Sequence, residues 1–338
     1  MNINTSLRFC GVLLATTVAL GALFGCSRRA GQFASSGDQH VVNIGYQAFG
    51  TFRILKSSGK LEEALRPLGY TVVWRQFQAG PPLIEALNAG KIDIGHVGEP
   101  PPLIAQASGV PFVYVGMEGP SPQALAILVP KTSSIRTLAG LKGKSVAIVK
   151  GTTSHCLLIS ALKEAGLTTD DVHIKYLEPP DARAAFEQGS IDAWVIWDPY
   201  YTSVLRDGRA RVLQDGTGLM ADREFYIGQT DFVREHPEVV KVVLRQLRDA
   251  DTYIASHKLA VAKLMSPDLG IDVPTLEVVI SHRTFGEGPV TSSAVARQQE
   301  LADMFHRIAL LPKSITVKDA VYDFSTPSHS ISPLPAKQ

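Results

Sequence analysis

ALNAGKIDIGHVGEP, residues 86–100, contains a pattern that the chain uses twice. Gly90-Lys91-Ile92-Asp93 recurs as Gly189-Ser190-Ile191-Asp192, and Glu99-Pro100 recurs as Asp198-Pro199 at the same offset. In each copy a helix ends at glycine, a short apolar strand follows, and a carboxylate–proline pair begins the next helix. Each copy is therefore predicted to be an αβα unit whose strand leads to a helix N-terminus, the place where α/β sheets bind ligands. Two such units indicate two lobes that face a cleft.

The N-terminus has the pattern of an export signal, which we assign to residues 1–25. Arg8 precedes an uncharged apolar run over residues 9–24, which is shorter than the ~20 residues that span a bilayer as a permanent helix. Leu23-Phe24-Gly25-Cys26 resembles the lipobox of bacterial lipoproteins, in which Cys26 is acylated. We expect a lipid-anchored protein of the periplasm or cell envelope; cleavage nearer Ala30, which would give an unanchored exported protein, is the alternative.

Charge and cysteine content exclude several classes of protein. The 338-residue chain has 33 basic and 32 acidic residues, and this balance gives no electrostatic reason to bind nucleic acid or a membrane surface in general. Cys10 lies in the signal and Cys26 is the lipidation site, so Cys156 is left without a disulfide partner. The length predicts about two domains.

Between the termini, strands and helices alternate in the order expected for α/β lobes built on parallel-rich sheets covered by helices. We predict a tether at 26–40, lobe 1 at 41–128 and 229–324, lobe 2 at 129–228, and a disordered tail at 325–338. The strands predicted at 124–129 and 225–228 are interpreted as the two crossings between the lobes. Residues 50–68 are predicted to be helical.

Six blocks of sequence, taken together and in order, resemble the aliphatic sulfonate-binding proteins of ABC importers. The blocks are Gly45-Tyr46-Gln47, Gln78-Ala79-Gly80-Pro81, residues 95–102 (GHVGEPPP), residues 150–155 (KGTTSH), residues 181–186 (DARAAF) and residues 191–201 (IDAWVIWDPYY). The resemblance covers roughly residues 42–324. It implies a two-lobed, type II periplasmic-binding-protein fold with two crossings between lobes. It also implies a protein that closes on a sulfonate and delivers it to a membrane permease and its ATPase, without catalysis or a cofactor. We expect the protein to be a monomer.

The loop at residues 150–155 is the strongest candidate anion site. It lies between a predicted strand and a predicted helix, so free backbone N–H groups and the hydroxyls of Thr152, Thr153 and Ser154, together with His155, can converge on an oxyanion. A sulfonate has three acceptor oxygens and no proton to donate, so it needs donors only. The alternative is that Thr153 or Ser154 merely caps the helix.

Donors from the other lobe are predicted at two places. Gln47 follows the first strand, and Gly50-Thr51 begins a helix; an ordinary turn with a cap is the alternative there. Arg283 is the candidate for a bidentate contact with the sulfonate, although an isolated arginine on a loop can equally be solvated. The resemblance implies an arginine near this position.

Glu99 and Asp198 require a separate explanation, because a carboxylate repels a sulfonate. For Asp198 we expect helix capping, and for Glu99 either capping or lining of the pocket, where it could contact an amino group of the ligand. Trp194 and Trp197 point to opposite faces of a strand, and Trp197 is the expected wall of the cleft.

An enzyme is the main alternative class, because the fold also occurs in a cysteine-dependent desulfinase. Cys156 follows His155 directly on a helix, where neighbours point about 100° apart, so this pair does not form a nucleophile and base. No histidine has the spacing of a metal site, and we expect neither a metal nor a cofactor. The sequence does not distinguish an aliphatic sulfonate from taurine, a sulfate ester or nitrate.

Overall fold

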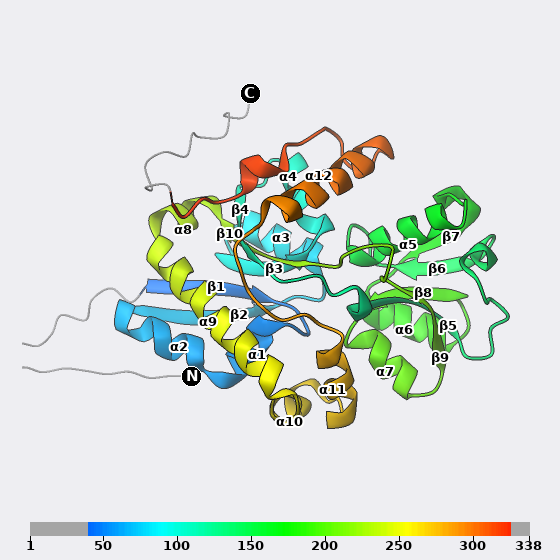
Figure 1. Ribbon diagram of the computed structural model, residues 1–338, viewed down its shortest axis with the longest axis horizontal. Helices are drawn as coiled ribbons and strands as arrows, with labels where there is room; N and C mark the ends of the chain where they lie inside the picture. The colour runs from blue at the N-terminus through cyan, green and yellow to red at the C-terminus, as the bar shows by residue number, and fades with distance from the viewer. Residues whose placement is uncertain (1–39, 326–338) are drawn as a thin grey trace, which may run out of the picture. The chain divides into compact units, whose positions relative to one another are not determined.

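The computed structural model describes residues 40–325, which belong to one compact unit (Figure 1). The predicted export signal, the lipidation site Cys26 and nearly all of the predicted tether and tail lie outside the described residues. Within residues 40–325, no helix has the length and apolar character that crossing a membrane would require.

Two five-stranded sheets of mixed direction form the framework. The first contains β1 (His40–Tyr46), β2 (Tyr70–Gln76), β3 (Ile94–Gly98), β4 (Phe112–Met117) and β10 (Glu224–Gln229) in the order β2-β1-β3-β10-β4. The second contains β5 (Leu125–Pro130), β6 (Ser145–Ile148), β7 (His173–Tyr176), β8 (Ala193–Trp197) and β9 (Ala210–Asp215) in the order β7-β6-β8-β5-β9. In each sheet only the fourth strand, β10 or β5, runs antiparallel to its neighbours. The predicted α/β class is confirmed, and we call the parts built on the two sheets the first half and the second half.

The two sheets exchange one strand each. The chain leaves the first sheet after β4 and enters the second at β5, then leaves the second after β9 and returns at β10. The two predicted crossings between the lobes are thus confirmed, but they lie just before the strands predicted at 124–129 and 225–228, because β5 and β10 are each hydrogen-bonded on both sides within one sheet. The passages between the sheets are the short connections at 118–124 and 216–223.

The sequence repeat has a shared structural role. Asp93 accepts a hydrogen bond from the Asn43 amide at 2.7 Å through its carboxylate and donates its own amide to the Asn43 carbonyl. Asp192 makes the same pair of bonds with Ser145, the carboxylate bond being 2.8 Å long. Each aspartate thus fixes the start of β3 or β8 against the parallel strand beside it, at the middle of β1 and at the first residue of β6.

Helices cover both faces of each sheet. The helices of the first half are α1 (Thr51–Ser58), α2 (Lys60–Leu65), α3 (Gly80–Asn88), α4 (Pro100–Ala107), α8 (Thr230–Glu235), α9 (Pro237–Ser256), α10 (Lys258–Leu269), α11 (Val273–Ser281) and α12 (Ser292–Arg307); those of the second are α5 (Thr153–Glu164), α6 (Pro179–Glu187) and α7 (Tyr200–Arg206). Helices α1, α2 and α9 pack on one face of the first sheet, and α3, α4 and α12 on the other. Helix α5 covers one face of the second sheet, and α6 and α7 the opposite face.

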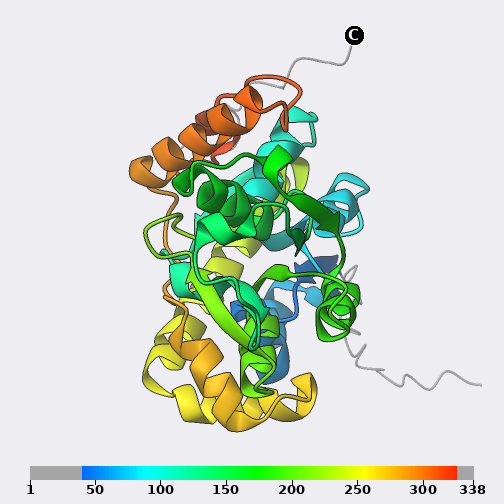
Figure 2. The same ribbon diagram turned by 90° about the vertical axis from the view of Figure 1, so that its right-hand side faces the viewer.

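Three helices of the first half border the second half from opposite ends, as both views show (Figures 1 and 2). Helix α12 lies at one end, and the pair α10 and α11 at the other. The predicted helix at 50–68 is divided at Gly59, whose φ of 69° ends α1 in the left-handed conformation that glycine adopts without strain. Strand β9 and helices α8, α10, α11 and α12 were not predicted.

Candidate functional site

A small cavity lies where the two halves meet, at the carboxyl ends of β1, β3 and β8. Its volume is about 30 Å³, room for about one water molecule. The lining residues come from both halves and from the returning connection: Gln47, Gly80, Gly98, Pro101, Thr152, Thr153, Trp197, Asp222, Glu224 and Arg283. Of the predicted binding residues, the cavity thus brings together Gln47, Thr152, Thr153, Trp197 and Arg283.

The N-terminus of α5 presents donors to this cavity. The amide N–H groups of Thr152, Thr153 and Ser154 have no acceptor within residues 40–325. The hydroxyl of Thr152 is bonded to the Val149 carbonyl at 2.8 Å, and that of Ser154 accepts from the Val149 amide at 3.1 Å. Those two hydroxyls therefore hold the loop in shape, and Ser154, which does not line the cavity, is removed from the residues predicted to bind there. The backbone and the Thr153 hydroxyl remain for a ligand.

His155 is behind the loop and does not line the cavity. Its Nδ1 lies 3.4 Å from the Gly151 amide, and its ring packs edge-on against Tyr176. Burial, with a contribution from Lys150, lowers the pKa of His155 to about 4. The imidazole is therefore neutral near pH 7, and its place outside the cavity lining removes His155 from the residues predicted to bind there.

Arg283 belongs to a buried polar network on the first-half wall. Its Nη2 donates to Glu224 Oε1 at 2.9 Å, while Nε and Nη1 have no partner among the described residues. Burial alone would raise the pKa of Glu224, but its interactions with His96 and Arg283 outweigh burial and lower it. The guanidinium is thus held by one carboxylate and keeps two donor atoms unused, as a binding arginine would.

His96 connects this network to Gln47. Its Nε2 lies 3.2 Å from the Gln47 amide and its Nδ1 lies 3.5 Å from Glu224 Oε2, while the Gln47 side chain donates to the His96 carbonyl at 3.1 Å. Gly50 allows this packing, because a Cβ there would lie 2.8 Å from the His96 ring. Gln47 is therefore oriented by His96, whereas Gly50 supports the ring and does not reach the cavity.

The Thr51 hydroxyl is already used inside the first half. It lies 2.6 Å from Asp251 Oδ1 and 3.2 Å from Glu118 Oε1, and the residue is buried. Asp251 in turn accepts the amides of Gly286 and Glu287 at 3.1 and 2.6 Å. The prediction of Thr51 as a ligand donor is corrected: the residue anchors the loop that follows Arg283.

The two carboxylates of the sequence repeat have different partners. Asp198 accepts the Thr202 amide at 3.2 Å, the expected capping contact, and also lies 2.8 Å from His282 Nδ1. Glu99 makes no capping bond and lies 3.4 Å from Arg223 Nη1. Neither side chain lines the small cavity, so the prediction that Glu99 and Asp198 bind the ligand there is corrected. Burial raises the pKa of each, partly offset by Arg223 for Glu99 and by His282 for Asp198.

The two tryptophans of β8 are placed on opposite faces of the strand. Trp194 is fully buried in the second half, whereas Trp197 is partly exposed and lines the cavity. The ring of Trp197 contacts the ring of Tyr200 edge to face, with 6.5 Å between the ring centroids. An apolar surface is therefore available beside the donors.

Several lining residues were not predicted from the sequence. Gly98 and Pro101 belong to the block at 95–102 that carries the family resemblance, as does His96 behind the wall, so that block contained the signal. Asp222 and Glu224 lie in the returning connection and at the start of β10, where no sequence pattern marks them.

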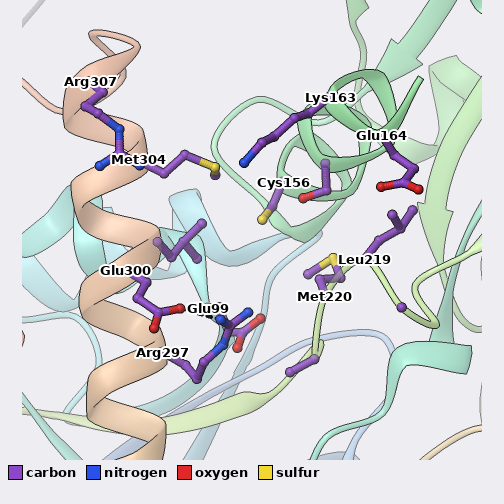
Figure 3. A pocket seen from close by; sticks show the side chains of 14 residues that line it. Glu99, Cys156, Lys163, Glu164, Leu219, Met220, Arg297, Glu300, Met304 and Arg307 are labelled. Atoms are coloured by element: carbon purple, nitrogen blue, oxygen red, sulfur yellow. Dashed lines mark hydrogen bonds and ion pairs between the residues drawn. The ribbon is translucent and has the colours of Figure 1, made fainter. Parts of the chain in front are cut away.

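A second, larger cavity has a volume of about 550 Å³ (Figure 3), and its lining residues Glu99 and Ala221 are the chain neighbours of Gly98 and Asp222 in the small one. Helix α12 forms one wall with Arg297, Met304 and Arg307, and α5 forms the other with Cys156 and Lys163; Glu99 and residues 218–221 complete it. Burial, then the carboxylates of Glu99 and Asp222, raise the pKa of the Cys156 thiol. This thiol is therefore not an activated nucleophile.

Three contacts between the halves surround the small cavity. Gly98 faces Thr153 so closely that a Cβ at Gly98 would lie 2.6 Å from Thr153 Cγ2. The Tyr200 hydroxyl lies 3.2 Å from Gln78 Oε1, and the Tyr201 hydroxyl lies 2.6 Å from His282 Nδ1. The two halves are thus in contact on several sides, and a ligand larger than water requires them to separate first.

Residues 40–325 contain no cluster of histidine, cysteine and carboxylate side chains that could hold a metal ion.

Comparison with known proteins gives consistent matches. The model of the NMT1/THI5-like family matches residues 78–258. A protein of Escherichia coli (strain K12) named as an aliphatic sulfonates-binding protein is 39% identical over 306 residues, covering 90% of this chain and 95% of that protein. The alkanesulfonate-binding protein of Xanthomonas axonopodis pv. citri, solved bound to MOPS, has a TM-score of 0.80 at 37% identity, covering 83% of this chain and 98% of that one.

A desulfurization enzyme solved with biphenyl-2-sulfinic acid is similar in fold alone. Its TM-score is 0.64 at 16% identity, covering 84% of this chain and 96% of that one. Such a low identity carries no information on activity, so the similarity extends to the two-sheet architecture only.

Proposed function

The chain belongs to the NMT1/THI5-like family, and it matches relatives that are named for binding aliphatic sulfonates. On that premise we propose that it is the extracytoplasmic solute-binding protein of an ABC importer. It binds a sulfonate between its two halves and delivers it to a membrane permease driven by an ATPase. It binds the solute reversibly and leaves it unchanged.

One observation carries this proposal: unused donors from both halves line the same cavity. Thr152 and Thr153 at the N-terminus of α5 line the cavity with amides that have no acceptor in the described chain, and Arg283 has two guanidinium nitrogens without a partner there. Amides at a helix N-terminus favour an anion through the helix dipole, and a guanidinium matches the planar face of oxygens on a sulfonate. Because the donors come from both halves, the anion favours the closed arrangement over an open one.

Nitrate, sulfate esters and taurine are other small anions that this donor set could hold, and they are tested beside alkanesulfonates. Thermal unfolding of the tag-free protein lacking residues 1–25 is measured with each anion. A true ligand at a hundredfold excess over its Kd stabilises the folded protein by about 2.7 kcal/mol. Stabilisation by sulfonates and not by nitrate supports the proposal, whereas stabilisation by nitrate alone would contradict it.

The binding role, as opposed to catalysis, is tested by recovering the ligand. After long incubation and dialysis, mass spectrometry should return the sulfonate intact. Release of sulfite or any altered product would reassign the protein to the enzymes of this fold. The raised pKa of the buried Cys156 thiol supports the expectation of an intact ligand.

We propose further that Cys26 carries the lipid anchor, that the protein acts in the periplasm or cell envelope as a monomer, and that no nucleic acid is involved. The support is the lipobox-like ending Leu23-Phe24-Gly25-Cys26 and the balanced charge. In cells, Cys26→Ala should move a folded, binding-competent protein from the membrane fraction to the soluble fraction. The variant removes the attachment site of the acyl chains, and more than one such chain is needed for stable anchoring. Labelled fatty acid on the Cys26→Ala protein would rule this anchor out.

A further inference from the structure

Two carboxyl groups line the small cavity, although a ligand anion has to enter it. Asp222 and Glu224 face the cavity together with Arg283, and no other charged side chain of residues 40–325 lines it. The volume is about 30 Å³, so an oxygen atom of a ligand placed there lies beside every group of the lining. An anionic oxygen is repelled by a carboxylate, whereas it accepts a hydrogen bond from a protonated carboxyl group. The protonation of these two groups therefore decides whether the cavity accepts an anion.

Glu224 is the carboxylate that stays ionised. Its Oε1 accepts a hydrogen bond from Arg283 Nη2 at 2.9 Å, and its Oε2 lies 3.5 Å from His96 Nδ1. Burial alone would raise the pKa of Glu224, but these two partners outweigh burial and lower it. The charges of Glu224 and Arg283 thus balance each other, and the net charge of the lining depends on Asp222.

Negative groups predominate around Asp222, which is only 5% exposed. The titratable groups that act on it electrostatically come from elements on all sides: Glu99 before α4, Cys156 on α5, Asp198 after β8, Tyr201 on α7, Glu224 on β10 and Arg283 after α11. Among these groups only Arg283 carries a positive charge, and it is already paired with Glu224. Burial, and then the carboxylate of Glu224, raise the pKa of Asp222 well above its ordinary value.

The backbone holds Asp222 at this place. In the returning connection, the carbonyls of Ala221 and Asp222 accept the Ser121 amide of the outgoing connection at 2.9 and 3.2 Å. Asp222 also has a φ of 51°, a left-handed conformation that is uncommon for residues other than glycine. Because the two connections between the halves meet here, the main chain of Asp222 cannot withdraw from the cavity unless the connections move.

We propose that Asp222 binds the sulfonate as a neutral carboxylic acid, which donates a hydrogen bond to a sulfonate oxygen and keeps its proton, so that closure on the ligand takes up one proton from solvent. The inference rests on the proposed function. When the halves are apart, water reaches Asp222, and a hydrated aspartate is ionised above about pH 4. Closure replaces the water with the surrounding carboxylates and the ligand's charge, and the acid form is then favoured.

The sign of the pH dependence follows from this difference. The pKa of Asp222 is higher in the closed, liganded protein than in the open one. The affinity that the acid form contributes is fully present below the pKa of the open protein, and it is lost as the pH rises through the pKa of the closed protein.

The test uses butanesulfonate and isothermal titration of the wild-type protein. Its Kd should be at least tenfold higher at pH 8.0 than at pH 5.5. At pH 6.5, titration in cacodylate and in imidazole, buffers with different heats of ionisation and no sulfonate group, should show an uptake of at least about half a proton per ligand. A Kd independent of pH, without proton uptake, overturns the inference and leaves the proposed function standing. Failure to bind at either pH overturns the proposed function as well.

Two variants assign the proton to Asp222. Asp222→Asn keeps a donor that does not titrate, whereas Asp222→Gly removes the donor, and both residues tolerate the left-handed backbone. The Kd of each variant should change less than threefold between the two pH values, without proton uptake. Asp222→Asn should bind at least as tightly as the wild type at pH 8.0, and Asp222→Gly about fivefold more weakly than Asp222→Asn, because one hydrogen bond is lost.

The control Asp231→Asn removes an exposed carboxylate of α8 and should keep the wild-type pH dependence. Proton uptake that survives in Asp222→Asn would exclude Asp222 as the group that gains the proton. Equal affinities of Asp222→Asn and Asp222→Gly would exclude a hydrogen bond from this position to the ligand.

Discussion

At the scale of single residues, Arg283 is the group whose contribution can be measured most directly. Its guanidinium is buried, bound on one side to Glu224 and unused on the other. We expect Arg283→Ala to weaken sulfonate binding by ~2 to 5 kcal/mol, as for the loss of one partner of a buried charge pair. Calorimetric titration with the best ligand measures this, with circular dichroism to check folding.

Two further variants separate geometry from charge. Arg283→Lys should recover only part of the affinity, because an ammonium keeps the charge but loses the planar fork. Arg245→Ala removes an exposed arginine of α9 and should leave the affinity unchanged. If Arg283→Ala binds within threefold of the wild type, Arg283 is not in the binding site.

His155 gives a prediction on pH and stability. Burial, then Lys150, lowers the pKa of His155 to about 4, below its ordinary value near 6.5. The unfolded chain therefore takes up a proton at a higher pH than the folded protein does. The stability that neutral His155 contributes is present above pH 6.5 and is lost as the pH falls toward 4, by about 2 to 3 kcal/mol.

Urea unfolding at pH 7 and pH 4.5 measures that loss. His155→Gln should lose less stability between the two pH values than the wild type, because glutamine does not titrate. The exposed His173, replaced in the same way, serves as the control and should behave as the wild type. A pH dependence of His155→Gln equal to that of the wild type would contradict the assignment.

At the scale of elements, the contact between the end of β3 and the start of α5 controls how closely the halves approach. Gly98 lacks a side chain where a Cβ would lie 2.6 Å from Thr153 Cγ2. Gly98→Ala should disfavour the closed arrangement by about 1.4 kcal/mol or more and raise the sulfonate Kd about tenfold. Its free energy of unfolding should change little, because the clash disappears when the halves separate.

Gly288→Ala is the matched control for this prediction, since a Cβ at Gly288 meets no atom within 4 Å. Titration of both variants under the same conditions tests the steric explanation. If Gly98→Ala binds as tightly as Gly288→Ala, the β3–α5 contact does not limit closure.

At the scale of the whole molecule, we expect closure to depend on a polar contact between the halves that does not itself reach the anion. The Tyr201 hydroxyl and Asp198 both contact His282, which links α7 of the second half to the end of α11 in the first. Tyr201→Phe should raise the sulfonate Kd by roughly 5- to 30-fold, the effect of losing about 1 to 2 kcal/mol, mainly through faster dissociation.

Tyr200→Phe provides the comparison. The Tyr200 hydroxyl also reaches across the halves, to Gln78, but this contact is exposed and should contribute less than threefold. Stopped-flow measurement of dissociation rates distinguishes the two. Equal rates for Tyr201→Phe and the wild type would show that the α7–α11 contact does not hold the closed state.

The sequence by itself determined the α/β class, most of the strands and helices, and the loop at the start of α5. These features depend on short-range patterns: apolar periodicity, glycine at helix ends, and donors at a helix N-terminus. The repeated aspartates also marked the equivalent strands β3 and β8, because each bonds to the strand that pairs with it. The sheet to which β5 and β10 belong was not recognisable, since strand exchange depends on pairing between distant segments.

Within the candidate site, only the tertiary structure decided which polar groups remain free. The hydroxyls of Thr51 and Ser154 are bonded internally, and His155 lies behind the loop. Asp222 and Glu224 reach the cavity because the returning connection passes beside β3 and α5. A residue type states what a side chain can donate or accept, but its partners come from elements far apart in the chain, and those partners determine what is left for a ligand.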